Sequence, residues 1–172
     1  MKSRILFMLT VPFLFFMSGC GVYSFTGGSI GALKTVSVVI FENTAPLVNP
    51  NLSQAFTEAL KDRIRSQTGL SFVRTDGEAN FDGRITDYNL QPVAIQGNQQ
   101  VTAGLTRLTI TVNVKYTNRL EGEQDKSFEQ SFTRFKDFNP TSGPFSSQEN
   151  TLVKDINQQL TEDIYNRAFA NW

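Results

Sequence analysis

The chain has 172 residues, with 16 basic and 16 acidic side chains and no histidine. A chain of this length forms one domain with a real hydrophobic core. Its balanced charge argues against non-specific nucleic-acid binding, which requires a clustered basic face. The lack of histidine excludes Ser-His-Asp and Cys-His catalysis and removes the commonest metal ligand.

The first twenty residues are typical of a bacterial export signal. Lys2 and Arg4 precede a short apolar run from Ile5 to Met17, which Ser18-Gly19-Cys20 follows. The run is too short for a transmembrane helix, which needs about 20 apolar residues, and the order matches a secretory signal. Ser18-Gly19-Cys20 resembles the lipobox of lipoproteins, in which signal peptidase II cuts before a lipid-modified cysteine. The alternative is an ordinary signal peptide with an incidental Cys20 thiol.

We expect residues 1–19 to form a lipoprotein signal peptide and residues 20–33 to form an acylated cysteine with a flexible tether. Acyl chains such as palmitate on Cys20 would anchor the protein stably, because two or more chains hold permanently. Gly21 stands where Asp is the inner-membrane retention signal of enterobacteria, so that sorting code implies the periplasmic face of the outer membrane. Cys20 is the only cysteine, so no disulfide is expected.

Residues 34–172 are expected to form a single domain that opens with a strand and a helix. Val36, Val38 and Ile40 share one side of a strand at residues 34–41. A helix is predicted from Asn49 or Pro50 to Thr68, with Asn49 as its cap and a left-handed Gly69 after its end. Its apolar stripe recurs every four residues: Leu52, Phe56, Leu60 and Ile64.

Strand signals resume at residues 71–75 and again at residues 81–90. In the second segment Phe81 and Ile85 point to one side, whereas Tyr88 and Leu90 have the opposite parity. A β-bulge or bend between the two pairs is therefore predicted. The polar residues that follow, 91–104, read as a long connection that a partner would contact, as do residues 139–147.

The clearest strand spans residues 105–118. Every second residue from Leu108 to Tyr116 is apolar, and the residues between them are polar. Because side chains of a strand alternate between the two faces of a sheet, this segment has one dry face and one wet face. The dry face requires a cover, and the two amphipathic helices of the chain are the obvious candidates.

A last strand at residues 126–138 precedes a last helix. Ser146 and Glu149 match a capping box at the start of that helix, in which each side chain bonds the backbone of the other. Apolar residues then recur every four positions: Leu152, Ile156, Leu160 and Ile164. The element order predicts an α+β two-layer sandwich, with two helices on one face of a four- to five-stranded, mostly antiparallel sheet.

No catalytic or cofactor motif accompanies this pattern. The sequence has no phosphate-binding glycine loop and no further cysteine for a thiolate or zinc site. Asp82 and Asp87 are candidate acid–base groups of an envelope hydrolase, but isolated acids on strand ends and turns are usually solvated. We therefore expect a protein that is not an enzyme and holds no metal or cofactor beyond the covalent lipid.

Three stretches together resemble the lipopolysaccharide-assembly lipoprotein family, LptE. They are residues 20–27 (CGVYSFTG), residues 132–140 (FTRFKDFNP) and the helix end at 164–168 (IYNRA). The resemblance implies an outer-membrane lipoprotein that plugs the lumen of the β-barrel LptD, in a one-to-one complex, supports its assembly and helps to deliver lipopolysaccharide to the outer leaflet. An accessory lipoprotein of another envelope machine, such as a secretion channel or a peptidoglycan synthase, is the alternative.

Four cations are candidate contacts for the phosphates of lipopolysaccharide. Arg107 and Lys115 share a face of the central strand, and Arg134 and Lys136 share a face of the last strand. If the two strands pair as a hairpin, the four side chains would form one cationic patch, and Arg and Lys suit phosphate. The alternative is that they are ordinary surface cations, which also discourage edge-to-edge aggregation of strands.

Overall fold

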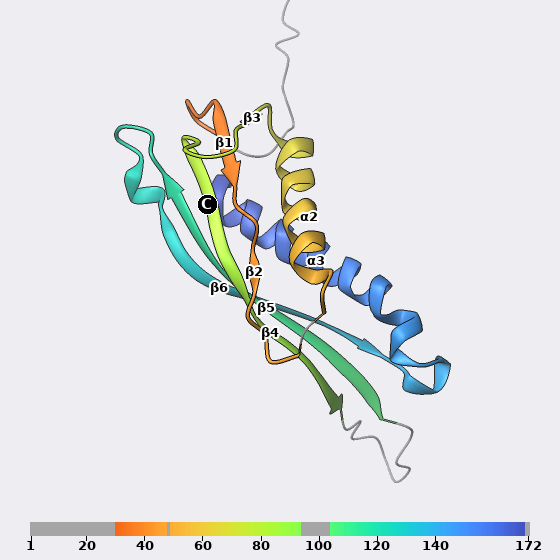
Figure 1. Ribbon diagram of the computed structural model, residues 1–172. Coiled ribbons are helices and arrows are strands. Elements are labelled where there is room, and N and C mark those ends of the chain that lie inside the picture. The colour runs from red at the N-terminus through yellow and green to blue at the C-terminus, as the bar shows by residue number, and fades with distance from the viewer. Residues whose placement is uncertain (1–29, 48, 94–103, 171–172) are drawn as a thin grey trace, which may run out of the picture.

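The computed structural model describes residues 30–47, 49–93 and 104–170, in which two helices cover one face of a six-stranded sheet (Figure 1). The predicted leader, Cys20 and most of the tether lie outside these residues, as do residues 94–103 of the long connection. The strands are β1 (Thr35–Val38), β2 (Glu42–Asn43), β3 (Ser71–Phe72), β4 (Ala79–Val93), β5 (Leu105–Asn118) and β6 (Phe128–Phe138). The helices are α2 (Leu52–Gln67) and α3 (Phe145–Phe169), with short 3₁₀ turns at Gln124–Lys126 and Pro140–Ser142. No described helix is long and apolar enough to cross a membrane.

The sheet is mixed, with the strand order β3-β1-β4-β5-β6 and β2 paired to β4. The three long strands β4, β5 and β6 form an antiparallel meander, whereas β1 runs parallel to both β3 and β4. The predicted α+β two-layer fold is confirmed. The sheet has six strands because the short β2 is added to the predicted segments; β3 lies within the strand predicted at residues 71–75.

The central strand β5 supplies the middle of the core. Its alternate apolar side chains, from Leu108 to Tyr116, are all essentially inaccessible to solvent. The apolar stripes of α2 and α3 are buried against them, as predicted. Each such aliphatic side chain contributes about 1.5–3 kcal/mol when it leaves water, so this layer accounts for most of the fold's stability.

A β-bulge divides β4, as the parity of its apolar residues predicts. Ile85 lies opposite Val112, Tyr88 lies opposite Ile110, and the register shifts between Ile85 and Asp87. The extra residue moves Tyr88 to the same face as Phe81, so both halves of the long strand direct apolar groups at the helices. Without the bulge, one half would point its apolar set at solvent.

The first strand ends earlier than its alternation suggests. β1 stops at Val38, and the side chain of Ile40 is 60% exposed, whereas Phe41 is fully buried. The backbone N–H of Phe41 donates to the Thr57 hydroxyl, and its ring packs edge-on against Phe56 at 5.0 Å between centroids. These contacts with α2 turn the chain so that Phe41, and not Ile40, enters the core.

Three predicted helix-end motifs are wrong. α2 begins at Leu52 with Asn51, not Asn49, at its N-cap position. Gly69 has no positive φ, because Thr68 ends α2 in an extended conformation and its hydroxyl donates to the Ile64 carbonyl. The predicted capping box of Ser146 and Glu149 does not form, since α3 begins at Phe145 and has no side-chain cap. Glu149 instead accepts hydrogen bonds from other elements of the fold.

Candidate functional site

The face of the sheet opposite the helices is a broad polar surface, which we call the open face; no described helix covers it (Figure 1). It carries the polar side chains of β5 and their cross-strand neighbours on β6. Thr111 and Thr133 share a hydrogen bond of 2.9 Å between their hydroxyl oxygens, and Asn113 donates to the Ser131 hydroxyl at 3.5 Å. The strands β5 and β6 therefore present a ladder of hydroxyl and amide groups.

Arg107 lies on the open face, where the carboxylate of Asp137 balances its charge. Its guanidinium donates two hydrogen bonds to the Asp137 carboxylate, at 2.7 and 2.9 Å, and lies 3.7 Å from the centroid of the Phe135 ring. The paired guanidinium lowers the pKa of the Asp137 carboxyl below its ordinary value. The arrangement covers part of Phe135, whose side chain is otherwise exposed.

Lys115 lies on the same open face, towards the other end of β5. The register places it between Asp82 on β4 and Glu129 on β6. Opposite charges on neighbouring strands of one face attract each other, so these carboxylates offset the lysine charge. Arg107 and Lys115 do not create a strongly basic surface, because acidic residues flank both.

Arg134 and Lys136 lie on the other face of the sheet, towards the helices. The Arg134 guanidinium donates to both oxygens of Asp163 on α3, at 2.6 and 2.7 Å, and the Lys136 ammonium is 3.1 Å from an oxygen of Asp155. The predicted single cationic patch is therefore wrong. Ile110 faces Arg134 in the register, so both of these β6 cations point to the helix side and fasten α3 to the sheet.

A partly buried polar contact joins three elements at one end of the helix layer. The Glu149 carboxylate on α3 accepts a hydrogen bond of 2.6 Å from the Tyr88 hydroxyl on β4. The same oxygen accepts from the side-chain amide of Asn49, just before α2, at 2.7 Å. Burial, followed by the bond to Glu149, raises the pKa of the Tyr88 phenol well above its ordinary value.

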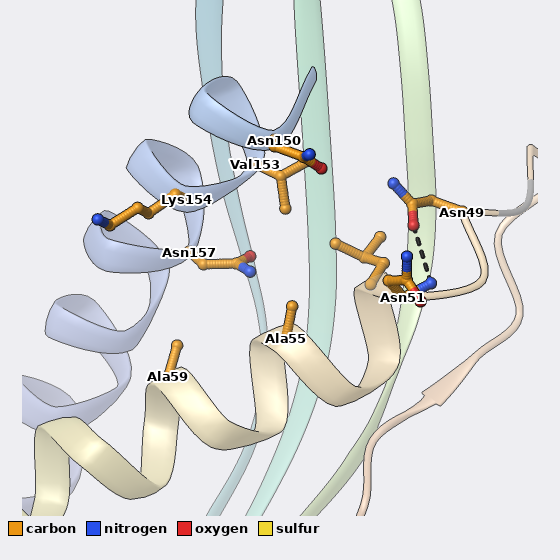
Figure 2. A pocket seen from close by; sticks show the side chains of 9 residues that line it. Asn49, Asn51, Ala55, Ala59, Asn150, Val153, Lys154 and Asn157 are labelled. Atoms are coloured by element: carbon orange, nitrogen blue, oxygen red, sulfur yellow. Dashed lines mark hydrogen bonds between the residues drawn. The ribbon is translucent and has the colours of Figure 1, made fainter. Parts of the chain in front are cut away.

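A pocket of about 170 Å³ opens between α2 and α3 beside this contact (Figure 2). We call it the interhelical pocket. Its lining consists of Asn49, Asn51, Leu52, Ala55, Ala59, Asn150, Val153, Lys154 and Asn157. The Asn157 side chain points from α3 towards α2, is 3% exposed, and its Oδ1 has no hydrogen-bond partner among the described residues.

Sequence reasoning missed this pocket, although one signal was present. Val153 and Asn157 are four residues apart on α3, so Asn157 interrupts the helical stripe that the apolar residues define. On the opposite wall, Ala55 and Ala59 leave space because their side chains end at Cβ. A polar residue in an apolar stripe, opposite small residues, is a pattern that indicates a polar cavity.

The described residues show no arrangement that would hold a metal ion, since no three Asp, Glu, His or Cys side chains gather in them. Asp82, one of the two candidate acid–base groups, accepts a hydrogen bond of 3.0 Å from the Asn80 side-chain amide on the same strand. Asp87 faces Thr111 in the register, beyond the bulge of β4. The candidate binding surfaces are the open face and the interhelical pocket.

Solved structures share this fold at low sequence identity. The hypothetical protein CT253 of Chlamydia trachomatis is 13% identical with a TM-score of 0.52, and the match covers 78% of this chain and 94% of that one. Protein XCC0632 of Xanthomonas campestris is 9% identical with a TM-score of 0.52, and the match covers 80% and 87%. The PelC dodecamer of Paraburkholderia phytofirmans is 11% identical with a TM-score of 0.50, and the match covers 85% and 94%. At these identities the likeness shows the fold alone.

No curated protein is significantly similar to the chain in sequence. A family model, by contrast, matches residues 33–168, which is nearly the whole described domain. The model describes lipopolysaccharide assembly and carries the name LptE, the family that the motifs of the sequence resemble. The match confirms the role in lipopolysaccharide assembly and the absence of enzyme activity. The chain belongs to the lipopolysaccharide-assembly family LptE, whose members are non-enzymatic envelope lipoproteins.

Proposed function

We propose that this protein is an outer-membrane lipoprotein that plugs the LptD β-barrel, supports its assembly and takes part in delivering lipopolysaccharide to the outer leaflet. Membership of the LptE family over residues 33–168 is the observation that carries the proposal. The resemblance of the sequence to that family supplies the barrel as the partner, in a one-to-one complex.

The open face has the surface chemistry that a plug requires. The interior of a large outer-membrane barrel is polar and wet, so a domain inside it must present hydrogen-bonding groups instead of an apolar patch. Along β5 and β6 the open face offers threonine, serine and asparagine side chains, and Asp137 compensates the Arg107 charge. Neutral, adaptable groups of this kind bond to a polar wall without the cost of burying unpaired charge.

The anchor belongs to the same proposal. Acylated Cys20 would hold the domain at the periplasmic face of the outer membrane, within reach of a barrel in that membrane. Ile30, the first described residue, stands ten positions after Cys20, and an extended chain over that interval spans at most about 35 Å. Replacement of Cys20 by Ser is expected to release the protein from the membrane fraction and to abolish palmitate labelling.

Contact of lipopolysaccharide with Arg107, Lys115, Arg134 and Lys136 stays a prediction. The four side chains lie on two faces of the sheet, as two separate pairs. Each pair is therefore tested by itself. An anion that binds at either pair has to compete with carboxylates that already neighbour the cations.

The deciding experiment is a detergent pull-down of the tagged, acylated protein from its own envelope, with mass spectrometry of the proteins that co-purify. A plug remains bound to its barrel, so we expect stoichiometric recovery of an LptD-type barrel. Recovery of a secretion channel or a peptidoglycan synthase in its place, or of no partner, would overturn the assignment. An untagged strain treated in the same way controls for non-specific recovery.

A further inference from the structure

The interhelical pocket contains a hydrogen-bond acceptor that the described fold leaves unused. Asn157 lies on the buried side of α3, and its Oδ1 has no partner among the described residues (Figure 2). Buried polar groups in folded proteins are nearly always paired, so an unpaired one requires an explanation. Oδ1 is covered in the structure, so the Asn157 amide would have to turn towards the pocket before a group with an N–H or O–H at its tip could pair with this oxygen.

The remaining walls define the body of such a group. Leu52, Ala55, Ala59 and Val153 line the pocket with aliphatic carbon, whereas Asn51 and Asn150 are exposed side chains on its rim. The volume of about 170 Å³ is smaller than that of common small-molecule sites. The pocket therefore fits one side chain with an apolar body and a polar tip, as in tyrosine or tryptophan.

Two other occupants fit less well. A sugar ring carries hydroxyls around its whole edge, and those facing Ala55, Ala59 and Val153 would be buried without partners. A lysine or arginine side chain would bring a second cation towards Lys154, which also lines the pocket. A neutral aromatic side chain avoids both penalties.

The position of the pocket indicates which partner supplies that side chain. The pocket lies between α2 and α3, and these helices cover the face of the sheet opposite the open face (Figure 1). A barrel that encloses the domain surrounds both of its layers, so the helix layer faces the barrel wall or its loops as the open face does. A second groove, of about 360 Å³, shares Ala59 and Lys154 with the pocket and lengthens the contact surface along α2 and α3.

We propose that the interhelical pocket is an anchor site for one tyrosine or tryptophan side chain of the barrel partner, whose O–H or N–H donates to Oδ1 of Asn157. The inference rests on the proposed function, because it takes the barrel as the partner. Aromatic side chains that enter small, desolvated pockets carry a large share of the affinity in protein interfaces.

The test compares pull-downs of three variants with that of the wild-type chain. Ala55→Phe fills the pocket, and because Ala55 is exposed the substitution does not disturb the core. Gln54→Phe is the matched control, since Gln54 is the neighbouring exposed residue and does not line the pocket. Asn157→Leu keeps the size of the side chain but removes the acceptor. Thermal unfolding of each variant establishes that it is folded.

We expect Ala55→Phe to recover about tenfold less barrel than Gln54→Phe, which should match the wild type. Asn157→Leu should also recover less barrel, although its melting temperature is equal to or above that of the wild type, because an unpaired buried amide has been removed. If Asn157 had a purely structural role, its replacement would lower the barrel recovery and the melting temperature together. A lower barrel recovery without a lower melting temperature is expected only of a residue that binds the partner.

The outcomes separate the two proposals. Equal recovery of barrel by Ala55→Phe and Gln54→Phe, or full recovery by Asn157→Leu, would overturn the anchor site and leave the plug function intact. Loss of lipopolysaccharide binding in Ala55→Phe with unchanged barrel recovery would assign the pocket to a saccharide, and would also overturn the anchor site. Failure of the wild-type chain to recover a barrel would overturn both proposals.

Discussion

The hydroxyl of Tyr88 donates a hydrogen bond of 2.6 Å to the carboxylate of Glu149, a residue 61 positions later in the chain. The bond fastens the start of α3 to the half of β4 that follows the bulge. Asn49 donates to the same carboxylate oxygen, so the start of α2 is held at the same point. This one contact fixes how the helices sit on the sheet beside the interhelical pocket.

Removal of either partner of this contact is expected to destabilise the fold. Tyr88→Phe should lower the free energy of unfolding by about 1–3 kcal/mol, the range for a hydrogen bond to a charged group. Denaturant unfolding at neutral pH measures the loss. Tyr88→Phe removes the bond and Glu149→Gln removes the charge that strengthens it, so the double variant should lose less than the sum of the single losses. Strict additivity would show that the bond contributes nothing.

Stability should decline at alkaline pH because the folded state keeps its buried phenols protonated. Burial, and to a smaller extent the charge of Glu123, raises the pKa of Tyr116 from 10.0 to about 12, and the pKa of Tyr88 is also raised. Above pH 10.0 the unfolded chain releases protons that the folded chain retains. The contribution is thus fully present below that pH and is lost as the pH rises towards about 12.

Denaturant unfolding in steps of pH checks this prediction. Tyr116→Phe should flatten part of the alkaline decline, and it should cost little at neutral pH because the Tyr116 hydroxyl has no hydrogen-bond partner among the described residues. A free energy of unfolding that stays level through the alkaline range would contradict the raised pKa values.

Gly83 in β4 tolerates no side chain. Its φ is +157°, and a Cβ added there would lie 2.1 Å from the Asn113 carbonyl oxygen and 2.8 Å from a ring carbon of Phe41. We expect Gly83→Ala to destabilise the fold by more than about 2 kcal/mol, because the obstructing oxygen belongs to the backbone of the neighbouring strand.

Gly69 provides the matched control for that substitution. A Cβ at Gly69 would have no atom within 4 Å, and its φ is not positive. Gly69→Ala should therefore be neutral, or stabilise the fold by up to about 1 kcal/mol through the unfolded chain. Thermal and denaturant unfolding of the two variants give the comparison; similar losses for both would refute the role of close packing at Gly83.

The two pairs of candidate cations should differ in their effect on lipopolysaccharide binding. The open-face variant, Arg107→Gln with Lys115→Gln, is expected to weaken binding several-fold at low salt, and added salt should erase the difference. The helix-face variant, Arg134→Gln with Lys136→Gln, should bind as the wild type does, because both side chains are paired with acids of α3, whereas Lys115 of the open-face pair makes no ion pair among the described residues. Its cost in stability should stay within about 1 kcal/mol, since these are largely exposed ion pairs.

Binding of labelled lipopolysaccharide to the detergent-solubilised chain measures this effect. If neither variant changes the binding, the phosphate contacts lie elsewhere. If the helix-face variant alone loses binding, α3 must move away from β6 when lipopolysaccharide binds.

The parts of the fold that could be predicted depend on local periodicity. The alternation along β5 and the change of parity between Ile85 and Tyr88 can be recognised from residues that are close in sequence. The structure confirms the strand and the bulge. Predictions of which hydrogen-bond partner a side chain would take were less accurate. Glu149 has a local capping partner within its own helix, yet the buried hydroxyl of Tyr88 takes it, because a charge-assisted bond out of water is stronger than an exposed cap.

The candidate cationic patch failed for a related reason. Pairing of the two strands did not by itself establish which face each residue occupies. Phe132 is buried and shares parity with Arg134 and Lys136, so the orientation of these cations towards the helices was available from the sequence. The interhelical pocket depends on the approach of two helices that are about a hundred residues apart in sequence, which no local pattern specifies.

Of the two helices that cover the sheet, α3 follows every strand in the chain, whereas α2 precedes β3 to β6. α3 ends at Phe169, and the apolar face of β5 and β6 packs against it. A chain that crosses a membrane from its N-terminus would therefore leave part of the apolar face around Leu108, Ile110 and Phe132 in water until the 25-residue helix α3 has emerged. The domain would therefore close its core only after α3 has emerged, and that face of the sheet would stay open until then.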